Sequence, residues 1–253
     1  MSGSQSLERG LAILELVNAS TQPLGVREIA RQLDLSPTIV QRFVKTLTER
    51  NYLKQDEATR RYSIGYTTLS LGSSLARTDN LLMAADQELN AIARDYSLNG
   101  YLGTLQNNRA VYLLSVKSHG PIVLLRQPGE LTYLHTTAMG KVLLASLPEE
   151  RARSMLGCGP LERKSPSTIT DPAAILSHLP AIRQQGYAVV ENENIEGIVS
   201  IGAPVKDAAG NVVAAISVAY ARQFAPELTI EKVAFIVAGS ALTISKNLGY
   251  PGR

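Results

Sequence analysis

The chain has 253 residues, of which 45% are hydrophobic and 19% are charged, and its formal net charge is +3. This size and composition suit two modest globular domains and exclude a wholly disordered chain. The single cysteine, Cys158, excludes an intramolecular disulfide and fits a reducing compartment. This mildly positive net charge is compatible with an anionic partner but does not by itself indicate one.

The N-terminal residues MSGSQSLERG have no basic stretch followed by an apolar one, as a secretion signal would have. No run of about 18 apolar residues is present, so no membrane-spanning helix is expected. One cysteine and three histidines argue against a structural zinc site. We therefore expect a soluble cytoplasmic protein that needs neither a metal nor an organic cofactor.

The first 66 residues predict three short helices and a β-hairpin. Ser6 can cap a first helix whose apolar positions are Leu7, Leu11, Ile13, Leu14 and Val17. The segment VREIARQL (26–33) predicts a second helix, and DLS is a tight connection to a third. This third helix opens with Ser36 as a natural N-cap and Pro37 at its first position.

A polar turn, DEAT, separates the short strand-like runs YLKQ (52–55) and RRYSIG (60–65). Two such runs around a turn predict a hairpin. Helix, helix, tight turn, helix and hairpin together are the plan of a winged helix-turn-helix domain.

The third helix has two different faces at the helical period. Its apolar arc, which predicts a buried face, consists of Ile39, Val40, Phe43, Val44 and Leu47. The other arc carries short polar, amide and cationic groups. Arginine can pair bidentately with guanine and glutamine with adenine, while threonine and lysine suit thymine methyl groups or phosphate. A plain solvated face is the alternative interpretation.

The surrounding residues favour nucleic acid over that alternative. Between Val26 and Tyr62 there are eight basic and five acidic residues, which gives 8 − 5 = +3, whereas the rest of the chain is neutral. A basic hairpin can meet the DNA backbone or the minor groove. The candidate DNA-binding residues are Arg27, Ser36, Thr38, Gln41, Arg42, Lys45, Arg60 and Arg61.

The middle of the chain predicts a helical linker. Residues 66–97 are mostly helical in pattern, with weak points at Gly72 and at Asp79-Asn80. We accordingly assign residues 1–66 to the winged helix-turn-helix domain, 67–80 to a linker helix and 81–253 to a second domain.

The second domain mixes strands and helices, which predicts an α+β fold of the sensor type. Expected strands cover residues 101–106, 110–116, 122–126, 187–191, 198–205 and 211–221, with a turn at 107–109 in the first hairpin. Expected helices cover residues 137–147, 148–156, 171–186 and 225–249.

The order and spacing of several segments closely resemble the IclR family of bacterial transcription regulators. These segments are SLERGLAILELV, REIARQLDLSPTIVQRFVKTLTERNYL, RRYSIG, LHTTAMGKVLLA, QQGYAVVENENIEGIVSIGAPVKD and GNVVAAISV. The resemblance implies a winged helix joined by a helical linker to a GAF-like α/β effector-binding domain. It also implies homodimers through the N-terminal domains, often paired into homotetramers, that bind double-stranded promoter DNA under the control of a small metabolite.

The resemblance further implies an effector site for a small carboxylate. Backbone amides at Ala138 and Met139, which begin the TAMGK helix, match the family's carboxylate site, and free amides at a helix start can hold an anion. Other family pocket positions match Leu124, Val190, Ile198, Ser200 and Ser217.

This sequence departs from the family pattern at three of these polar positions. Val190 stands where the family often has an acid, Ser200 where it has a cysteine, and Ala219 where it has a second serine. These changes disfavour a very small keto acid and favour a larger, more apolar, aromatic acid. Thr104 and Tyr133 are further candidates for polar contacts.

Arg126 is an additional candidate because it shares strand parity with Leu124 and could pair with a carboxylate. The alternative for Arg126 is a surface position on an edge strand.

Catalytic motifs are not convincing. TAMGKV lacks the first P-loop glycine and the Ser or Thr after Lys141, and the second domain offers no nucleophile–base pair at a recognisable spacing. The acidic residues Glu191, Glu193 and Glu196 are expected in a solvated loop rather than a metal site.

We therefore expect a ligand-responsive regulator of a catabolic operon and not an enzyme. One alternative is a small-acid-processing enzyme that carries a DNA-binding module, which turnover of its ligand would reveal. The other alternative is an assembly module, which would show no salt-sensitive DNA binding.

Overall fold

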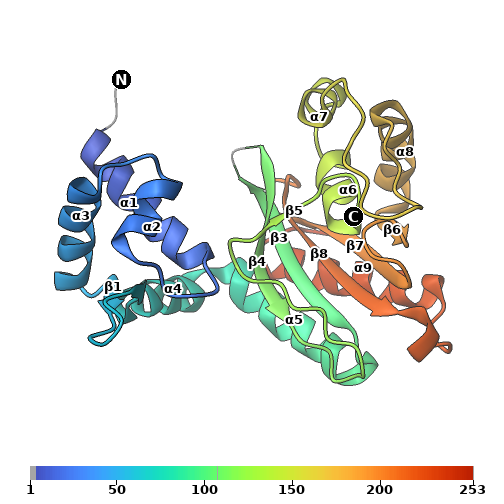
Figure 1. Cartoon of the computed structure of the whole chain (residues 1–253). Coiled ribbons are helices and arrows are strands. Elements are labelled where there is room, and N and C mark those ends of the chain that lie inside the picture. Colours follow the sequence, from blue (N-terminus) through green and yellow to red (C-terminus); the bar gives the residue numbers. More distant parts are fainter. Residues whose placement is uncertain (1–3, 107, 253) are drawn as a thin grey trace. The chain divides into compact units, whose positions relative to one another are not determined.

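A computed structural model describes residues 4–106 and 108–252 (Figure 1). Asn107, in the turn expected at 107–109, lies outside the described residues. The chain forms two compact units, of which the first ends at Thr78 and the second begins at Asp79. Among the described residues, every helix is too short or too polar to cross a lipid bilayer.

The first unit is a winged helix-turn-helix, as predicted. Its elements are α1 (Gln5–Ala19), α2 (Val26–Gln32), α3 (Pro37–Glu49), β1 (Leu53–Gln55), β2 (Tyr62–Ile64) and α4 (Tyr66–Thr78). The three first helices enclose a core that includes Ile13, Ile29, Val40 and Val44. β1 and β2 pair antiparallel as the wing, and Leu24 forms a further bridge to Tyr62.

The caps of this unit agree with the prediction at α3 and not at α1. The Ser36 side chain accepts the amide of Ile39 at 3.3 Å, and Pro37 occupies the first position of α3. The prediction that Ser6 caps the first helix is wrong, because the Glu8 amide already donates to the Ser4 carbonyl at 3.0 Å. The helix therefore begins earlier, and Ser6 lies inside its first turn.

The segment that follows the wing consists of two helices. α4 continues through Gly72, so the helix does not break there, since a helix tolerates a lone glycine at a modest cost. The break predicted at Asp79-Asn80 is confirmed. Asp79 caps α5 (Asn80–Tyr96) by accepting the amide of Leu82 at 3.0 Å.

The second unit is built on a six-stranded sheet with strand order β5-β4-β3-β8-β7-β6, in which every neighbouring pair is antiparallel. The strands are β3 (Asn99–Gln106), β4 (Arg109–Val116), β5 (Leu131–Thr132), β6 (Ala188–Glu191), β7 (Ile198–Lys206) and β8 (Val212–Ala221). Long strands such as β7 and β8 alternate their side chains between two covered faces.

Helices cover both faces of this sheet (Figure 1). α5 and α9 (Ile230–Asn247) pack against one face in a core that includes Leu89, Ile201 and Val237. The other face is covered by α6 (Ala138–Ala145), α7 (Glu149–Leu156) and α8 (Pro172–Gln185). This arrangement confirms the predicted α+β class with helices beside an antiparallel sheet.

Three elements differ from the prediction, and the first of them is the short strand β5, which was not predicted. Residues 121–127 are all described and form no strand, so the strand predicted at 122–126 is wrong. The backbone there bonds to side chains of β3 instead of to a neighbouring strand. The last helix begins at Ile230, where Thr229 caps it, rather than at residue 225, and a short 3-10 turn, η1 (Arg222–Phe224), precedes it.

The glycine of the TAMGK segment has a steric role. A Cβ atom at Gly140 would collide with the backbone of Tyr133 and Leu134. Only glycine therefore lets the start of α6 lie against the chain that leads into it, which positions this helix end beside the sheet.

Candidate DNA-binding surface and effector pocket

The polar arc of α3 is available to a partner. Thr38, Gln41, Arg42 and Lys45 are all exposed, while Val40 and Val44 on the opposite arc are buried. Lys45 lies 3.9 Å from Glu49 with both side chains largely exposed, and such a pair is weak enough to yield to a stronger anion.

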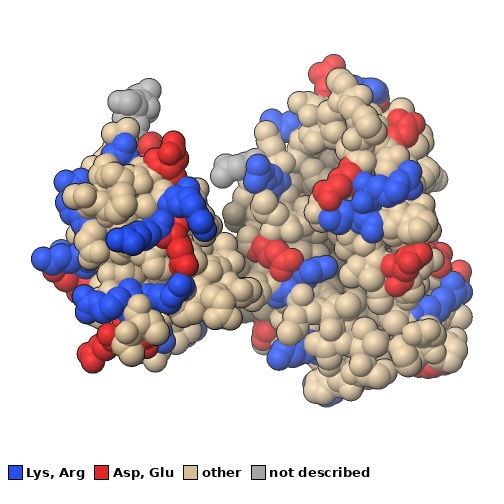
Figure 2. All heavy atoms as spheres, in the orientation of Figure 1, with Lys and Arg blue, Asp and Glu red and all other residues tan. Residues whose placement is uncertain are grey.

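A hollow of 380 Å³ lies between the start of α2, α3 and the wing. Of the predicted DNA-binding residues, Arg27, Gln41, Arg60 and Arg61 line it. Figure 2 shows Lys and Arg side chains gathered over this unit. A hollow with several cationic walls suits a phosphate backbone.

The two wing arginines have different surroundings, which the sequence did not reveal. Both terminal nitrogens of Arg61 donate to the Glu28 carboxylate at 2.9 Å. Its Nη1 also donates to the Pro23 carbonyl at 2.7 Å. The Gly25 amide donates to the same carboxylate at 2.9 Å. Arg60 is exposed and adopts a left-handed backbone with φ 57° at the end of the turn.

The hydrogen bond from Gly25 and then the pairing with Arg61 lower the pKa of Glu28 below its ordinary value. Because the folded pKa is lowered, this pair stabilises the fold above the ordinary carboxyl range, and the stabilisation disappears as the pH falls through the folded pKa. Arg61 thus holds the wing against α2 through a charge-assisted pair.

Arg60→Ala is expected to reduce the slope of log K against log salt concentration for DNA binding by about one unit, since each phosphate contact releases about one counterion. Arg61→Ala is expected to raise amide hydrogen exchange in β1 and β2, because it removes the pair with Glu28. Titrations at several salt concentrations and exchange of the DNA-free protein check both results. Equal salt slopes for the two variants, with unchanged exchange, would make Arg61 a phosphate contact instead.

A second site lies on the sheet face that α6 covers. It is a narrow cavity of 40 Å³. The predicted effector residues that line it are Leu124, Arg126, Val190, Ile198, Ser200 and Ser217. Strand alternation explains this gathering, because Ile198 with Ser200, and Ser217 with Ala219, lie at alternate positions of neighbouring strands.

Ala138 and Met139 do not line the cavity and are wholly buried. Thr136 and Thr137, directly before α6, line it instead. Between described residues, the amides of Ala138 and Met139 form no hydrogen bond, whereas the Gly140 amide donates to Thr137 Oγ1 at 3.0 Å. The helix start therefore keeps free amides directly behind the cavity wall.

Sequence reasoning missed several lining residues. These are Tyr101, Tyr112, Thr136, Thr137, Asn194 and Ile195. The parity of Tyr101 on β3 could have indicated it, but the loop residues have no such signal. Thr104 faces a different cavity and donates to the Val213 carbonyl at 2.7 Å, and Tyr133 accepts from Lys164 at 2.8 Å.

The cavity has aromatic, aliphatic and neutral polar walls, with one cation among the lining residues described. The rings of Tyr101 and Tyr112 lie 5.5 Å apart. Burial raises the pKa of Tyr101, so its hydroxyl stays protonated and donates to the Leu124 carbonyl at 2.5 Å. Arg126 is the only charged side chain among the described lining residues, and it lies 3.3 Å from Glu130.

The lysine of TAMGK pairs inside the protein. Lys141 Nζ lies 2.5 Å from Glu193 Oε1, and both side chains are almost wholly buried. The expectation of a solvated loop is therefore wrong for Glu193, although Glu191 and Glu196 are exposed. The reason is that α6 passes beneath this loop, a tertiary relation between residues 52 positions apart.

Comparison with known proteins identifies the families of both parts of the chain. The family model for the C-terminal domain of the bacterial transcriptional regulator IclR matches residues 73–246. The model for the IclR helix-turn-helix domain matches residues 6–57. The HTH-type transcriptional regulator BhcR of Paracoccus denitrificans is 34% identical over 216 residues, which are 85% of this chain and 77% of that protein.

Solved structures share the fold. The Thermotoga maritima IclR structure has a TM-score of 0.75 at 29% identity and covers 97% of this chain and 99% of its own. An IclR homologue from Microbacterium hydrocarbonoxydans, complexed with 4-hydroxybenzoate, has a TM-score of 0.85 at 23% identity and covers 96% of this chain and 99% of its own.

The family models cover most of the chain, and these relatives are transcriptional regulators, not enzymes. A winged helix with an exposed cationic arc and an α/β domain with an internal cavity are the parts that such a regulator needs. This chain is a DNA-binding transcriptional regulator and belongs to the IclR family.

Proposed function

We propose that this regulator controls a catabolic operon in the cytoplasm and releases or binds its operator in response to an apolar, aromatic carboxylate. Residues 1–66 read the DNA, 67–80 link the domains and 81–253 sense the acid. The observation that carries the proposal is the cavity, which combines tyrosine, aliphatic and neutral polar walls with Arg126 as the one charged lining residue among those described.

On the DNA side, α3 enters the major groove and the wing touches the backbone. Four exposed polar side chains on one arc of α3 support this docking. Ser36 adds a capped helix start, where free amides attract phosphate. The hollow lined by Arg27 and Arg60 lies beside that arc.

A second copy of the chain completes the DNA-binding unit. All residues of α4 are described and none is buried, yet it carries Tyr66, Leu69, Leu71 and Leu75 with 78%, 67%, 56% and 58% exposure. Leu7 and Leu11 on α1 are exposed as well. A helix with this many uncovered apolar side chains is typical of an interface, and two-fold symmetry makes the operator pseudo-palindromic. Two such dimers pair into a homotetramer.

On the effector side, the acid's carboxylate pairs with Arg126 and faces the free amides behind Thr137. Arg126 already pairs with Glu130 at 3.3 Å with both side chains partly exposed, so a ligand carboxylate competes with an accessible and weak partner. The Tyr101–Tyr112 pair supplies a wall suited to an aromatic ring.

The walls move apart when the acid enters. The cavity has a volume of 40 Å³, whereas a cavity of about 150 Å³ is needed to hold a benzene ring. This rearrangement gives the ligand a way to favour one conformation, which shifts the population able to span both half-sites.

A thermal-shift screen of aliphatic and aromatic carboxylates tests the proposed effector class. Benzoate or 4-hydroxybenzoate is expected to raise the melting temperature more than acetate or pyruvate, because binding to the native state alone stabilises it. A hit is then tested for altered binding to the DNA upstream of this protein's own gene. A preference for pyruvate over every aromatic acid would refute the effector class while leaving DNA binding in place.

Arg126→Ala is expected to weaken binding of the effective aromatic acid by about 10-fold to 100-fold, because a charge-assisted hydrogen bond contributes about 1.5–3 kcal/mol. Isothermal calorimetry measures this change. Arg109→Ala, at the exposed first position of β4, removes a cation that does not line the effector cavity and serves as the control. Unaltered affinity for Arg126→Ala would remove this residue from the pocket.

A further inference from the structure

One wall of the effector cavity has no regular secondary structure. The segment 117–126 supplies Leu124 and Arg126 to the cavity, yet all its residues are described and none is in a strand or helix. Among the described residues, no neighbouring strand pairs with this segment, and side chains of β3 bond to its backbone groups at Ile122 and Leu124 instead.

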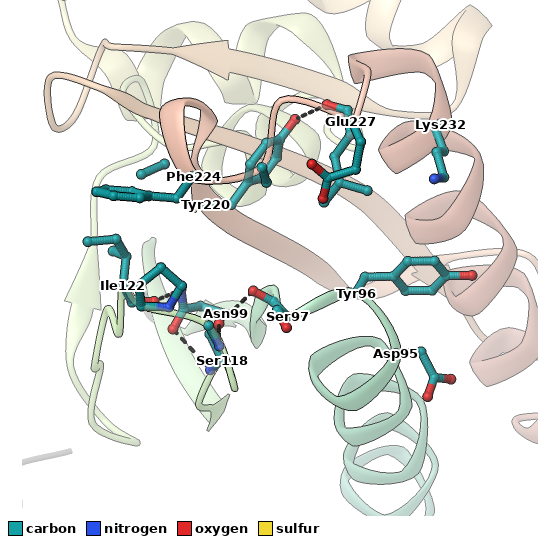
Figure 3. A pocket seen from close by; sticks show the side chains of 15 residues that line it. Asp95, Tyr96, Ser97, Asn99, Ser118, Ile122, Tyr220, Phe224, Glu227 and Lys232 are labelled. Atoms are coloured by element: carbon teal, nitrogen blue, oxygen red, sulfur yellow. Dashed lines mark hydrogen bonds between the residues drawn. The ribbon is translucent and has the colours of Figure 1, made fainter.

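The side chain of Asn99, on β3, supplies most of these partners. It is 1% exposed. Its Oδ1 accepts the amides of Ser118 at 3.2 Å and Leu124 at 3.0 Å, and its Nδ2 donates to the Ile122 carbonyl at 3.0 Å. Figure 3 shows Asn99 between Ser118 and Ile122.

The same amide also bonds to the neighbouring strand of the sheet. Nδ2 donates to the Ala219 carbonyl on β8 at 3.1 Å, and Ala219 lines the cavity as Leu124 does. One side chain thus joins the irregular wall to the sheet wall. Asn99 itself lines a separate cavity of 430 Å³, shown in Figure 3, and not the effector cavity.

We propose that Asn99 is a positioning residue that sets the width of the effector cavity and thereby the size of acid that the regulator accepts. This inference rests on the proposed effector site. Because Asn99 does not line that cavity, its influence on a ligand passes through the backbone at Leu124 and Ala219. Loosening this link should favour large acids over small ones, whereas general destabilisation would weaken both alike.

The test compares Asn99→Ala with Thr104→Val in the full-length protein. Thr104 is a matched control, because it lies on the same strand and also donates a side-chain hydrogen bond to a β8 carbonyl, that of Val213, without contacting the segment. Asn99→Asp, which keeps the accepting oxygen, is the second variant if Asn99→Ala does not fold.

Hydrogen exchange of the ligand-free proteins is measured on peptides that cover residues 118–126. Exchange there is expected to rise about 10-fold or more in the Asn99 variant, because the segment loses the hydrogen bonds that hold it against the sheet and opens more often. In the control, exchange is expected to stay at the wild-type level. Unchanged exchange in both Asn99 variants would overturn the proposal whatever ligand the protein binds.

Calorimetry with benzoate and 2-naphthoate measures the size preference. The ratio of the benzoate Kd to the 2-naphthoate Kd is expected to rise about fivefold or more in the Asn99 variant, because a wider cavity admits the second ring. A ratio that changes less than about twofold while both acids bind would show that Asn99 supports the fold only. Failure of the wild-type protein to bind either acid would instead count against the proposed effector, and hydrogen exchange would then decide on Asn99.

Discussion

Arg42→Ala is expected to lower the affinity for the operator by about 1–3 kcal/mol and to relax the preference for one base pair, because a bidentate arginine–guanine contact provides that discrimination. Arg42 lies on the exposed arc of α3 within the first turns after the Ser36 cap. Gln41→Ala is expected to act in the same way at an adenine. Binding to the operator and to systematically altered operators measures both effects.

Lys45→Ala is the matched comparison on the same helix. It is expected to weaken binding to operator and random DNA alike, since a phosphate contact carries no base information. If Arg42→Ala lowers the affinity for operator and random DNA by the same factor, α3 does not read bases through this residue.

Placing two charges on one stripe of α4, with Leu71→Glu and Leu75→Glu, is expected to separate the N-terminal domains of the two copies. The wild-type preference for a complete operator over a single half-site is expected to fall by about 100-fold or more, because the second half-site contact is no longer intramolecular. Leu71 and Leu75 are more than half exposed within one copy, so the fold of that copy should be retained.

Ser70→Glu with Ser74→Glu is the control for this experiment. It adds the same two charges at the same spacing on exposed positions of α4, about 100° around the helix from the leucines. If the leucine variant still prefers the complete operator over a single half-site as strongly as the wild type does, another surface joins the two copies on DNA.

Local signals in the sequence were sufficient for most of the helices, α3 among them. Ser36 with Pro37 marked the start of α3, and the apolar arc marked its buried face. Asp171 caps α8 by accepting the amide of Ala173 at 3.0 Å, and Gly186 ends it with φ 79°. Such signals depend only on residues within one or two helical turns of each other, so they can be recognised in the sequence alone.

The resemblance to a family supplied what periodicity could not. It identified Leu124, Ile198 and Ser200 as pocket positions, and these residues line the cavity. It could not supply Tyr112 or Asn194, which reach the cavity from β4 and from a loop. The strand predicted over 122–126 was wrong because side chains of β3, which no local pattern reports, take up its backbone groups.

By itself, the sequence determined a winged helix with an exposed polar and cationic arc, an antiparallel sheet with covering helices, and the regulator family. Only the tertiary structure separated Arg60 from Arg61, paired Lys141 with Glu193 and joined Asn99 to Leu124 and Ala219. The physical reason is that the identity of a charged or amide residue does not reveal whether its side chain contacts solvent or a protein partner. In these three cases the partner lies 33, 52 and 120 positions away in the sequence. Only the folded structure brings such distant residues into contact.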